Sequence, residues 1–256
     1  MIVCRSLAEI MKMRTANQFV AQALGELAAA VAPGVTTLDL DRLAERLCRD
    51  AGAEPAFKGY RGYPATLCAS INDEVVHGIP SGTRVLREGD VISLDMGAKL
   101  DGYFGDSAVT VPVGQVPDDA VRLLHVTQQA LERAIAQARP GGRLSDIGHA
   151  VQTWVESHGF SVVREFVGHG IGEKLHEDPQ IPNYGAPGKG PKLAEGMVLA
   201  IEPMVAAGRP ETKVLGDGWT AVTKDGSLAA HFEHTVAVTA DGPLVLTQPV
   251  GVHAGR

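Results

Sequence analysis

The stretch GDVISLDMGAKLDGYFGDSAVTV, residues 89–111, holds two runs of strand-forming residues separated by a short polar turn. Each run carries one acidic residue among apolar neighbours, Asp95 in the first and Asp106 in the second. Runs rich in Val, Ile and Thr that flank a turn containing Gly and Asp are typical of a β-hairpin. The stretch therefore predicts an antiparallel pair of strands that brings two carboxylates close together.

The turn of this hairpin decides how the two carboxylates face each other. If it centres on Leu100 and Asp101, Asp95 and Asp106 stand directly opposite each other on one face. Leu-Asp is not a favoured two-residue turn, and a longer turn with a left-handed Gly102 would shift the register. Either turn leaves the two carboxylates near neighbours.

A second copy of the first strand lies 107 residues further along the chain. At this offset GDVISLD, which ends at Asp95, falls on GMVLAIE, which ends at Glu202. After an insertion in the second copy, DSAVTV starting at Asp106 resembles EHTVAV starting at Glu233. Self-similarity at a fixed offset indicates duplication, and it sorts the four carboxylates into two equivalent pairs.

Two pairs of amphipathic segments repeat at the same offset, and a Pro-Gly stop closes the first helix of each pair. Chance similarity is the ordinary alternative, but the coincidence of the carboxylates favours duplication. The sequence thus predicts one α+β domain over residues 1–256, with internal repeats at about 7–111 and 117–239. Strands from both repeats would line a shared site, and helices would cover the outer face. The predicted helices span residues 6–31, 37–50, 117–139 and 145–158.

Four acids inside apolar strands are costly, because a buried carboxylate loses several kcal/mol of hydration and like charges repel. For one acid alone, a solvent-facing strand position is the ordinary explanation; four acids in two repeats favour a metal centre. Glu202 is the hardest to explain otherwise, since it interrupts an apolar run and precedes Pro203. Carboxylates with at most one imidazole suit Mn, Fe, Co or Zn, and such a site can hold two ions.

Histidines near these strands are the remaining candidates. His169 lies in VGHGIG, where flanking glycines allow a tight backbone, and the spacing fits neither a P-loop nor a dinucleotide fingerprint. His77 and His176 are candidates for hydrogen bonding or proton transfer. His231 shares a strand face with Glu233 and is expected to support a ligand from behind. Ordinary roles are expected for the other histidines considered, His125, His149, His158 and His253.

Composition limits the classes of function. A net charge of −7, from 30 acidic and 23 basic residues, argues against sequence-specific nucleic-acid binding. The first residues turn polar too soon for a secretory signal or a membrane helix, so no membrane partner is expected. Three cysteines without CxxC spacing support neither a disulfide framework nor a thiolate zinc site. These features together predict a cytoplasmic protein.

The sequence contains no convincing pairing of a nucleophile with a base. A Gly-x-Ser-x-Gly motif is missing, and the context of Cys68 does not mark a catalytic thiol. Water activated by a metal is the economical nucleophile, with a neighbouring carboxylate to carry the proton.

At this point the residues resemble a known family, the type I methionine aminopeptidases. The resemblance spans nearly the whole chain, including the spacing of Asp95 and Asp106. The family has the pita-bread fold, whose internal pseudo-two-fold symmetry and curved antiparallel sheet agree with the duplication. Only about 30 residues separate Glu202 from Glu233, too few for the insertion of type II enzymes. The most specific segments are CASINDEVVHGIP at 68–80, GHGIG at 168–172, HEDP at 176–179 and EPM at 202–204.

The resemblance implies two divalent metal ions per chain, of Co, Mn, Fe or Zn. One ion would be held by Asp106, His169, Glu202 and Glu233, and the other by Asp95, Asp106 and Glu233. The shared carboxylates would bridge the two ions.

The resemblance also implies roles for the remaining site residues. Glu202 would handle the catalytic proton, His77 would contact the nitrogen side of the scissile bond, and His176 would stabilise the tetrahedral intermediate. An apolar and aromatic pocket would accept the unbranched thioether of methionine. That pocket maps to Phe57, Tyr60, Tyr63, Cys68, His77, Leu175 and Trp219.

The activity implied is removal of the initiator methionine from new polypeptides with a small second residue. Its partners would be nascent N-termini, with ribosome contact and a monomeric state expected. A proline-selective aminopeptidase P or prolidase shares the fold and the five ligands but usually carries an additional N-terminal domain. A non-catalytic pita-bread binding protein is the other alternative, although such relatives lose ligands that this chain keeps.

Overall fold

The computed structural model describes residues 1–248, so His253 lies outside the described part of the chain. The helices agree with prediction to within two residues at each end. The first two begin at capping boxes, Ser6 with Glu9 and Thr36 with Asp39, in which a hydroxyl and a carboxylate satisfy backbone donors of the first turn. The four helices are α1 (Leu7–Ala30), α2 (Thr37–Asp50), α3 (Asp118–Gln137) and α4 (Leu144–Ser157), and a short 3-10 turn, η1, spans Tyr60–Gly62.

Nine of the strands form one antiparallel sheet, in the order β1-β4-β5-β14-β9-β7-β8, with β2 also pairing β4 and β15 also pairing β14. Two three-stranded sheets, β13-β10-β6 and β11-β12-β3, extend it. The strands are β1 (Glu54–Pro55), β2 (Leu67–Ile71), β3 (Glu74–Val76), β4 (Val91–Leu100), β5 (Tyr103–Pro112), β6 (Ser161–Val162), β7 (Gly168–Gly170), β8 (Glu177–Ile181), β9 (Val198–Ile201), β10 (Met204–Ala206), β11 (Thr212–Val214), β12 (Ala221–Thr223), β13 (Ala229–His231), β14 (Glu233–Thr239) and β15 (Gly242–Val245).

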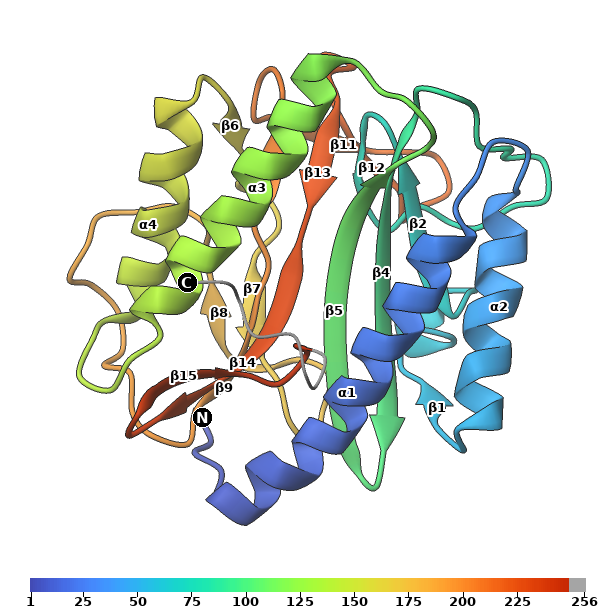
Figure 1. Ribbon diagram of the computed structural model, residues 1–256. Helices are drawn as coiled ribbons and strands as arrows, with labels where there is room; N and C mark the ends of the chain where they lie inside the picture. The colour runs from blue at the N-terminus through green and yellow to red at the C-terminus, as the bar shows by residue number, and fades with distance from the viewer. Residues whose placement is uncertain (249–256) are drawn as a thin grey trace.

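The helices cover one face of the large sheet, with α1 and α2 over one half and α3 and α4 over the other (Figure 1). Strand residues alternate between the two faces: Ile92 and Leu94 of β4 pack in the core under α1 and α2. Leu199 of β9 and Val236 of β14 pack in the equivalent core under α3 and α4. Burying each of these side chains stabilises the fold by about 1.5–3 kcal/mol. The opposite face of the same strands is left free for polar residues.

The hairpin of β4 and β5 turns at Asp101-Gly102, because Leu100 pairs with Tyr103. Both turn residues have positive φ, 51° and 86°, as a tight two-residue hairpin turn of the Asp-Gly type requires. This register corrects the expectation that Asp95 and Asp106 could stand directly opposite each other. Asp95 pairs with Ala108 and Asp106 pairs with Gly97, so the two carboxylates are diagonal neighbours on one face.

The two halves of the sheet meet where β5 pairs with β14, and there Ser107 lies opposite His234. The sequence alignment of the repeats makes these two residues equivalent, so a local two-fold axis passes through this pair. The symmetry is broken further out, because Met96 pairs with Ser107 whereas Ile201, not residue 203, pairs with His234. The second repeat is therefore shifted by two residues at β9, before Glu202 and Pro203 end the strand.

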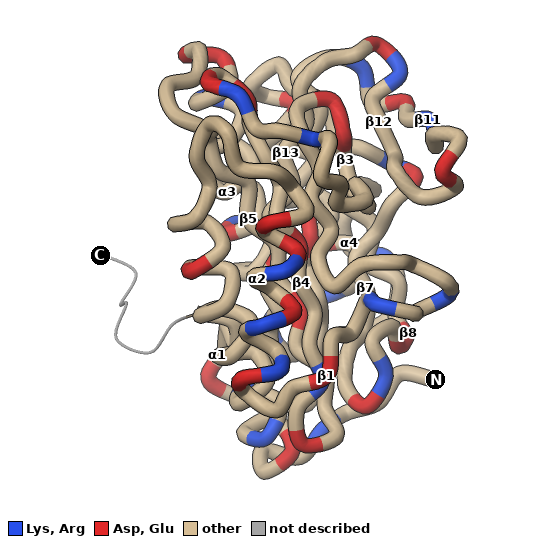
Figure 2. Tube along the Cα trace, turned by 90° about the vertical axis from the view of Figure 1, so that its right-hand side faces the viewer, with Lys and Arg blue, Asp and Glu red and all other residues tan. Residues whose placement is uncertain are grey.

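Basic and acidic residues are interspersed along the chain trace in Figure 2. No helix within residues 1–248 is long and apolar enough to span a membrane. The thiols of Cys4, Cys48 and Cys68 are all free.

Candidate metal centre and adjoining pocket

The predicted ligands lie on the face of the sheet opposite the helices, in two adjacent rows that run across the strands. In the first row, Ala108 of β5 pairs with Asp95 on one side and with Glu233 on the other. In the second row, Ala200 of β9 pairs with both Thr235 and His169, and Asp106 lies in line with them on β5. The hydroxyl of Thr235 donates to the carbonyl oxygen of Asp106 at 2.8 Å, which joins the two halves of this row.

Small residues separate the ligands along these rows. A Cβ added at Gly97 would lie 2.8 Å from the ring of Phe57 and 3.2 Å from a carboxylate oxygen of Asp106. Ala108 and Ala200 add only a methyl group between neighbouring ligands. The strand sequences thus keep the centre of the face open for the carboxylates.

His169 reaches the carboxylates from β7. Its Nδ1–H donates to the carbonyl oxygen of Gly170 at 2.9 Å, which leaves the Nε2 lone pair facing the cluster. The flanking glycines are needed for space and not for a left-handed backbone. A Cβ at Gly168 would lie 2.4 Å from the carbonyl oxygen of Ala200, and one at Gly170 would lie 2.2 Å from that of Asp178.

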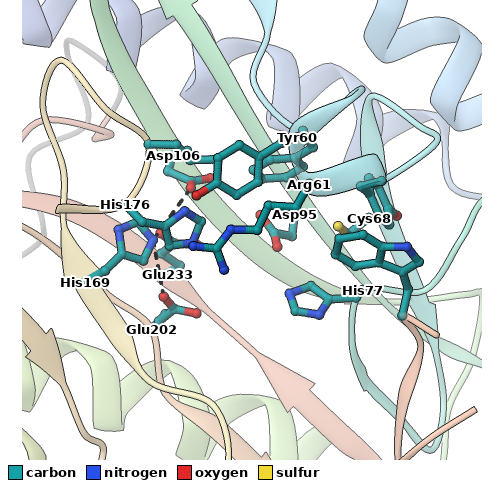
Figure 3. Close-up of a pocket in the computed structure, with 14 residues that line it drawn as sticks. Tyr60, Arg61, Cys68, His77, Asp95, Asp106, His169, His176, Glu202 and Glu233 are labelled. Carbon is teal, nitrogen blue, oxygen red and sulfur yellow. Dashed lines mark ion pairs between the residues drawn. The ribbon is translucent and has the colours of Figure 1, made fainter.

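The carboxylates and His169 converge closely enough to share a cation (Figure 3). Nε2 of His169 lies 3.9 Å from Oδ2 of Asp106 and 3.6 Å from Oε1 of Glu202. Ligand atoms of Asp106, His169 and Glu233 all lie within 4.8 Å of one another. So do those of Glu202, His231 and Glu233, which brings His231 to the site. Asp95 joins neither group among the described residues.

The electrostatics of this cluster suit a bound cation. Burial raises the pKa of Asp95 and of Glu202 to about 7. Burial raises the pKa values of Asp106 and Glu233 well above the ordinary range, and neighbouring carboxylates raise them further. One buried oxygen of Asp95, Asp106 and Glu233 each has no hydrogen-bond donor in the described structure. Oxygen donors that lack partners and repel one another fit divalent cations.

Glu202 is held from two sides. The side-chain amide of Asn183, 1% exposed, donates to the backbone carbonyl of Glu202 at 2.8 Å. Nε2 of the buried His231 lies 3.5 Å from Oε2 of Glu202, on the side away from His169. Burial lowers the pKa of His231, so its imidazole is neutral at neutral pH.

A cavity of about 150 Å³ opens beside the carboxylates. All residues predicted for the metal centre and the methionine pocket line it, and so does Arg61. One wall is aromatic: Tyr63 meets Trp219 edge-to-face at 5.1 Å, and its hydroxyl donates to the carbonyl oxygens of Leu67 and Gly78, each at 3.1 Å. Because these bonds use the hydroxyl, the ring presents an apolar surface to the cavity.

Two histidines lie on opposite sides of the cavity (Figure 3). The ring of His176 stacks on Tyr60 at 5.2 Å and lies 4.1 Å from the ring of His169. His77 packs edge-on against Phe166 at 5.5 Å and Trp219 at 6.1 Å. Burial lowers the pKa of His176 to about 3 and that of His77 to about 4. Both imidazoles are therefore neutral at neutral pH, and each can donate one N–H hydrogen bond.

Some supporting residues were not found from the sequence. Asp41 of α2 accepts hydrogen bonds from the backbone N–H groups of Thr66 and Leu67 at 2.8 and 2.9 Å, which fixes the start of β2 just before Cys68. Asn183 and Phe166 carry no local pattern that marks them. Arg61 follows a predicted pocket residue directly, and that adjacency was the only available signal.

Comparisons with known proteins agree with this geometry. Residues 11–240 match Metallopeptidase family M24. The chain is 55% identical over 248 residues to methionine aminopeptidase 1 of Bacillus subtilis, covering 97% of this chain and 100% of that protein. The crystal structure of a methionine aminopeptidase from Thermotoga maritima superimposes with a TM-score of 0.95 at 49% identity, covering 97% and 100% of the two chains. The prolidase from Pyrococcus horikoshii shares the fold alone, with a TM-score of 0.77 at 23% identity, and this chain covers 64% of it.

Proposed function

The chain belongs to metallopeptidase family M24, and from this premise we propose that it is a methionine aminopeptidase. It would remove the initiator methionine from new polypeptides whose second residue is small. The observation that carries the proposal is the direct contact of a carboxylate and histidine cluster with a small aromatic cavity. The extent of identity to methionine aminopeptidases, over nearly the whole of this chain, supports the same activity. The fold class predicted from the sequence agrees with these relatives.

Two divalent ions are proposed for the cluster, held as the sequence resemblance implied. The orphaned oxygens of Asp95, Asp106 and Glu233 and the free Nε2 of His169 support this assignment. Bound ions would supply Lewis acidity, which polarises a peptide carbonyl and acidifies water. The donor set of carboxylates and one imidazole suits Mn, Fe, Co or Zn without selecting among them.

Glu202 is proposed as the residue that moves the proton. Its carboxylate lines the cavity beside the other predicted ligands. A carboxylate in that place can accept a proton from attacking water and return it to the leaving amine. Asn183 holds the backbone of Glu202, and the buried His231 lies 3.5 Å from its Oε2.

The neutral imidazoles are proposed to handle the peptide itself. His176, fixed between Tyr60 and His169, would donate its N–H to the oxygen that becomes negative in the tetrahedral intermediate. His77, on the other side of the cavity, would hydrogen-bond the nitrogen side of the scissile bond. The aromatic wall of Tyr63 and Trp219 would take the methionine side chain and exclude water from the reacting atoms.

The remaining assignments follow from the substrate. Nascent polypeptides begin in the cytoplasm, so we propose a cytoplasmic enzyme that acts as a monomer and meets its substrates near the ribosome. Free thiols at Cys4, Cys48 and Cys68 are compatible with a reducing compartment.

The test is a metal-reconstitution series assayed on Met-Ala, Met-Lys and Ala-Pro peptides. Metal-dependent cleavage of Met-Ala, with little cleavage of Met-Lys, is the expected result. Faster cleavage of Ala-Pro would identify a proline-selective enzyme instead. Protein that binds Co, Mn or Fe ions weakly or not at all, and cleaves none of the peptides, would be a binding protein.

A further inference from the structure

Arg61 stands between two cavities. It lines the methionine cavity together with His169 and His176, and the same three residues also line a larger neighbouring cavity of about 630 Å³. Figure 3 shows its side chain extending from beside Tyr60 toward His176. A peptide whose first residue fills the small cavity and whose next residues enter the larger one passes beside Arg61.

The backbone at Arg61 is held in an unusual conformation. Its φ of 50° and ψ of 21° place it in the left-handed region, which a residue with a side chain seldom adopts. Strained residues persist where the surrounding structure fixes them, and they cluster at binding sites. Here the side chain lines both cavities, and the central carbon of the guanidinium lies 5.4 Å from the centre of the Tyr60 ring.

The charge of Arg61 is not neutralised. The acids of the larger cavity have other partners: Glu177 pairs with Arg5 at 2.7 Å, Glu173 pairs with Arg5 at 3.5 Å, and Asp178 pairs with the amino group of Met1. Among the described residues, no carboxylate lies within ion-pair distance of Arg61. Lys174, which lines the larger cavity, is a second such cation.

The path of the peptide indicates which residue meets Arg61. In an extended chain, successive side chains point to opposite sides, so the first and third point the same way. The predicted methionine pocket includes Tyr60, and Arg61 follows it at the boundary with the larger cavity. A third side chain on the methionine side of the peptide therefore comes next to the guanidinium.

We propose that Arg61 is a specificity residue which favours substrates with Asp or Glu at the third position. A planar guanidinium can bind a carboxylate through two parallel hydrogen bonds, and no internal acid competes for it. This inference rests on the proposed aminopeptidase activity and adds a preference beyond the methionine and the small second residue.

The experiment compares C-terminally amidated peptides Met-Ala-Asp-Gly-Gly and Met-Ala-Asn-Gly-Gly on the metal-reconstituted enzyme. Amidation removes the terminal carboxylate, and Asn matches Asp in shape. An exposed ion pair corresponds to a kcat/KM ratio of about fivefold in favour of Asp. R61Q should bring the ratio to about one, mainly through KM for the Asp peptide. R61K keeps the positive charge but loses the planar guanidinium that can form two parallel hydrogen bonds, so it should give an intermediate ratio.

Controls separate the possible failures. K12Q removes an exposed cation from the outer face of α1 and should keep the wild-type ratio. High salt should lower the ratio of the wild-type enzyme by screening, which tests the idea without any variant. A wild-type ratio of one, an R61Q ratio equal to wild type, or a ratio abolished by K174Q but kept by R61Q would overturn the assignment. If the wild-type enzyme cleaves neither peptide, the proposed activity itself fails.

Discussion

Asp95 and Glu233 flank the same residue, Ala108, from the strands on either side of β5. Two of the four clustered carboxylates are therefore separated by one methyl group. The spacing of Asp95 and Glu233 therefore depends on Ala108, whose side chain has no atom that could bind a metal.

Replacing Ala108 by a larger residue should disturb the proposed metal centre although no ligand is altered. Ala108 is 4% exposed, so A108V, which adds two methyl groups at a buried position, should destabilise the fold by about 1–3 kcal/mol. It should also weaken metal binding, because the added methyls push against both carboxylates. Isothermal titration with Mn²⁺ would measure the loss. Serine is nearly the size of alanine, and A108S should bind Mn²⁺ much as wild type does; equal binding by A108V would contradict this account.

Replacing Glu202 by Gln should lower kcat about 10²–10⁴-fold, because an amide cannot accept and return the proton. The fold should persist, since Asn183 holds the backbone of residue 202 and not its carboxylate. Steady-state kinetics on Met-Ala peptides, with circular dichroism of the same samples, checks both points. E211Q alters an exposed glutamate of the same repeat and should keep wild-type kcat. Near-normal turnover by E202Q would remove the proton shuttle.

Metal removal should lower the melting temperature. The clustered carboxylates repel when no cation is present, and an ion at 100 times its Kd stabilises the native state by about 2.7 kcal/mol. For a chain of this size that corresponds to a shift of about 5–10 °C. Scanning calorimetry with EDTA and then with excess Mn²⁺ would measure it. D106N should lose most of the shift, whereas D118N, at an exposed position in α3, should keep it.

Stability should fall in acid partly because of His77. Burial lowers its pKa from 6.5 to about 4. The unfolded chain therefore takes up this proton below pH 6.5, while the folded chain takes it up only near pH 4. The contribution is complete above pH 6.5 and is lost as the pH falls to 4, by about 3 kcal/mol.

The variant H77N isolates this contribution, because Asn tolerates the positive φ of 62° at this position. Urea unfolding of both proteins at pH 7, 5.5 and 4.5 should show a shallower decline for H77N. Parallel declines would mean that His77 does not carry the effect. The lowered pKa of His176 predicts a residual slope of the same sign.

Asp41 should matter for substrate binding although it lies outside the cavity. D41A leaves two buried N–H groups without an acceptor and should destabilise the fold by about 2 kcal/mol. Because the start of β2 would loosen next to Cys68, KM for Met-Ala peptides should rise more than kcat falls. D50A, exposed at the end of the same helix, should change neither parameter. A loss of kcat alone would argue against a positioning role.

The sequence predicted the parts of the fold that local patterns determine. Capping boxes and Pro-Gly stops predicted the positions of the helices. Acidic residues within apolar strand sequences predicted the carboxylate cluster. The sequence left open a turn centred on Leu100 and Asp101 or a longer turn with a left-handed Gly102, and the structure has a two-residue turn at Asp101-Gly102, which Asp-Gly strongly favours. Moving the turn by one residue changes which residues of β4 and β5 pair with each other.

Other features depend on distant contacts and leave no local pattern. Asn183 meets Glu202 only after α4 and the β8 region fold against β9, and Arg61 owes its direction to a backbone conformation that its neighbours impose. The glycines beside His169 were expected for a tight backbone, yet close carbonyl oxygens from two other strands explain them. Such contacts are tertiary, so a single sequence cannot show them.

The position of Glu233 at the start of β14 has a consequence for biosynthesis. It contributes to both groups of converging ligand atoms, and it lies at position 233 of 256. A ribosome making this protein adds Glu233 after every other predicted ligand of the cluster. Copies that end before residue 233 would thus be inert toward the peptides around them, because they lack the donor that both groups share.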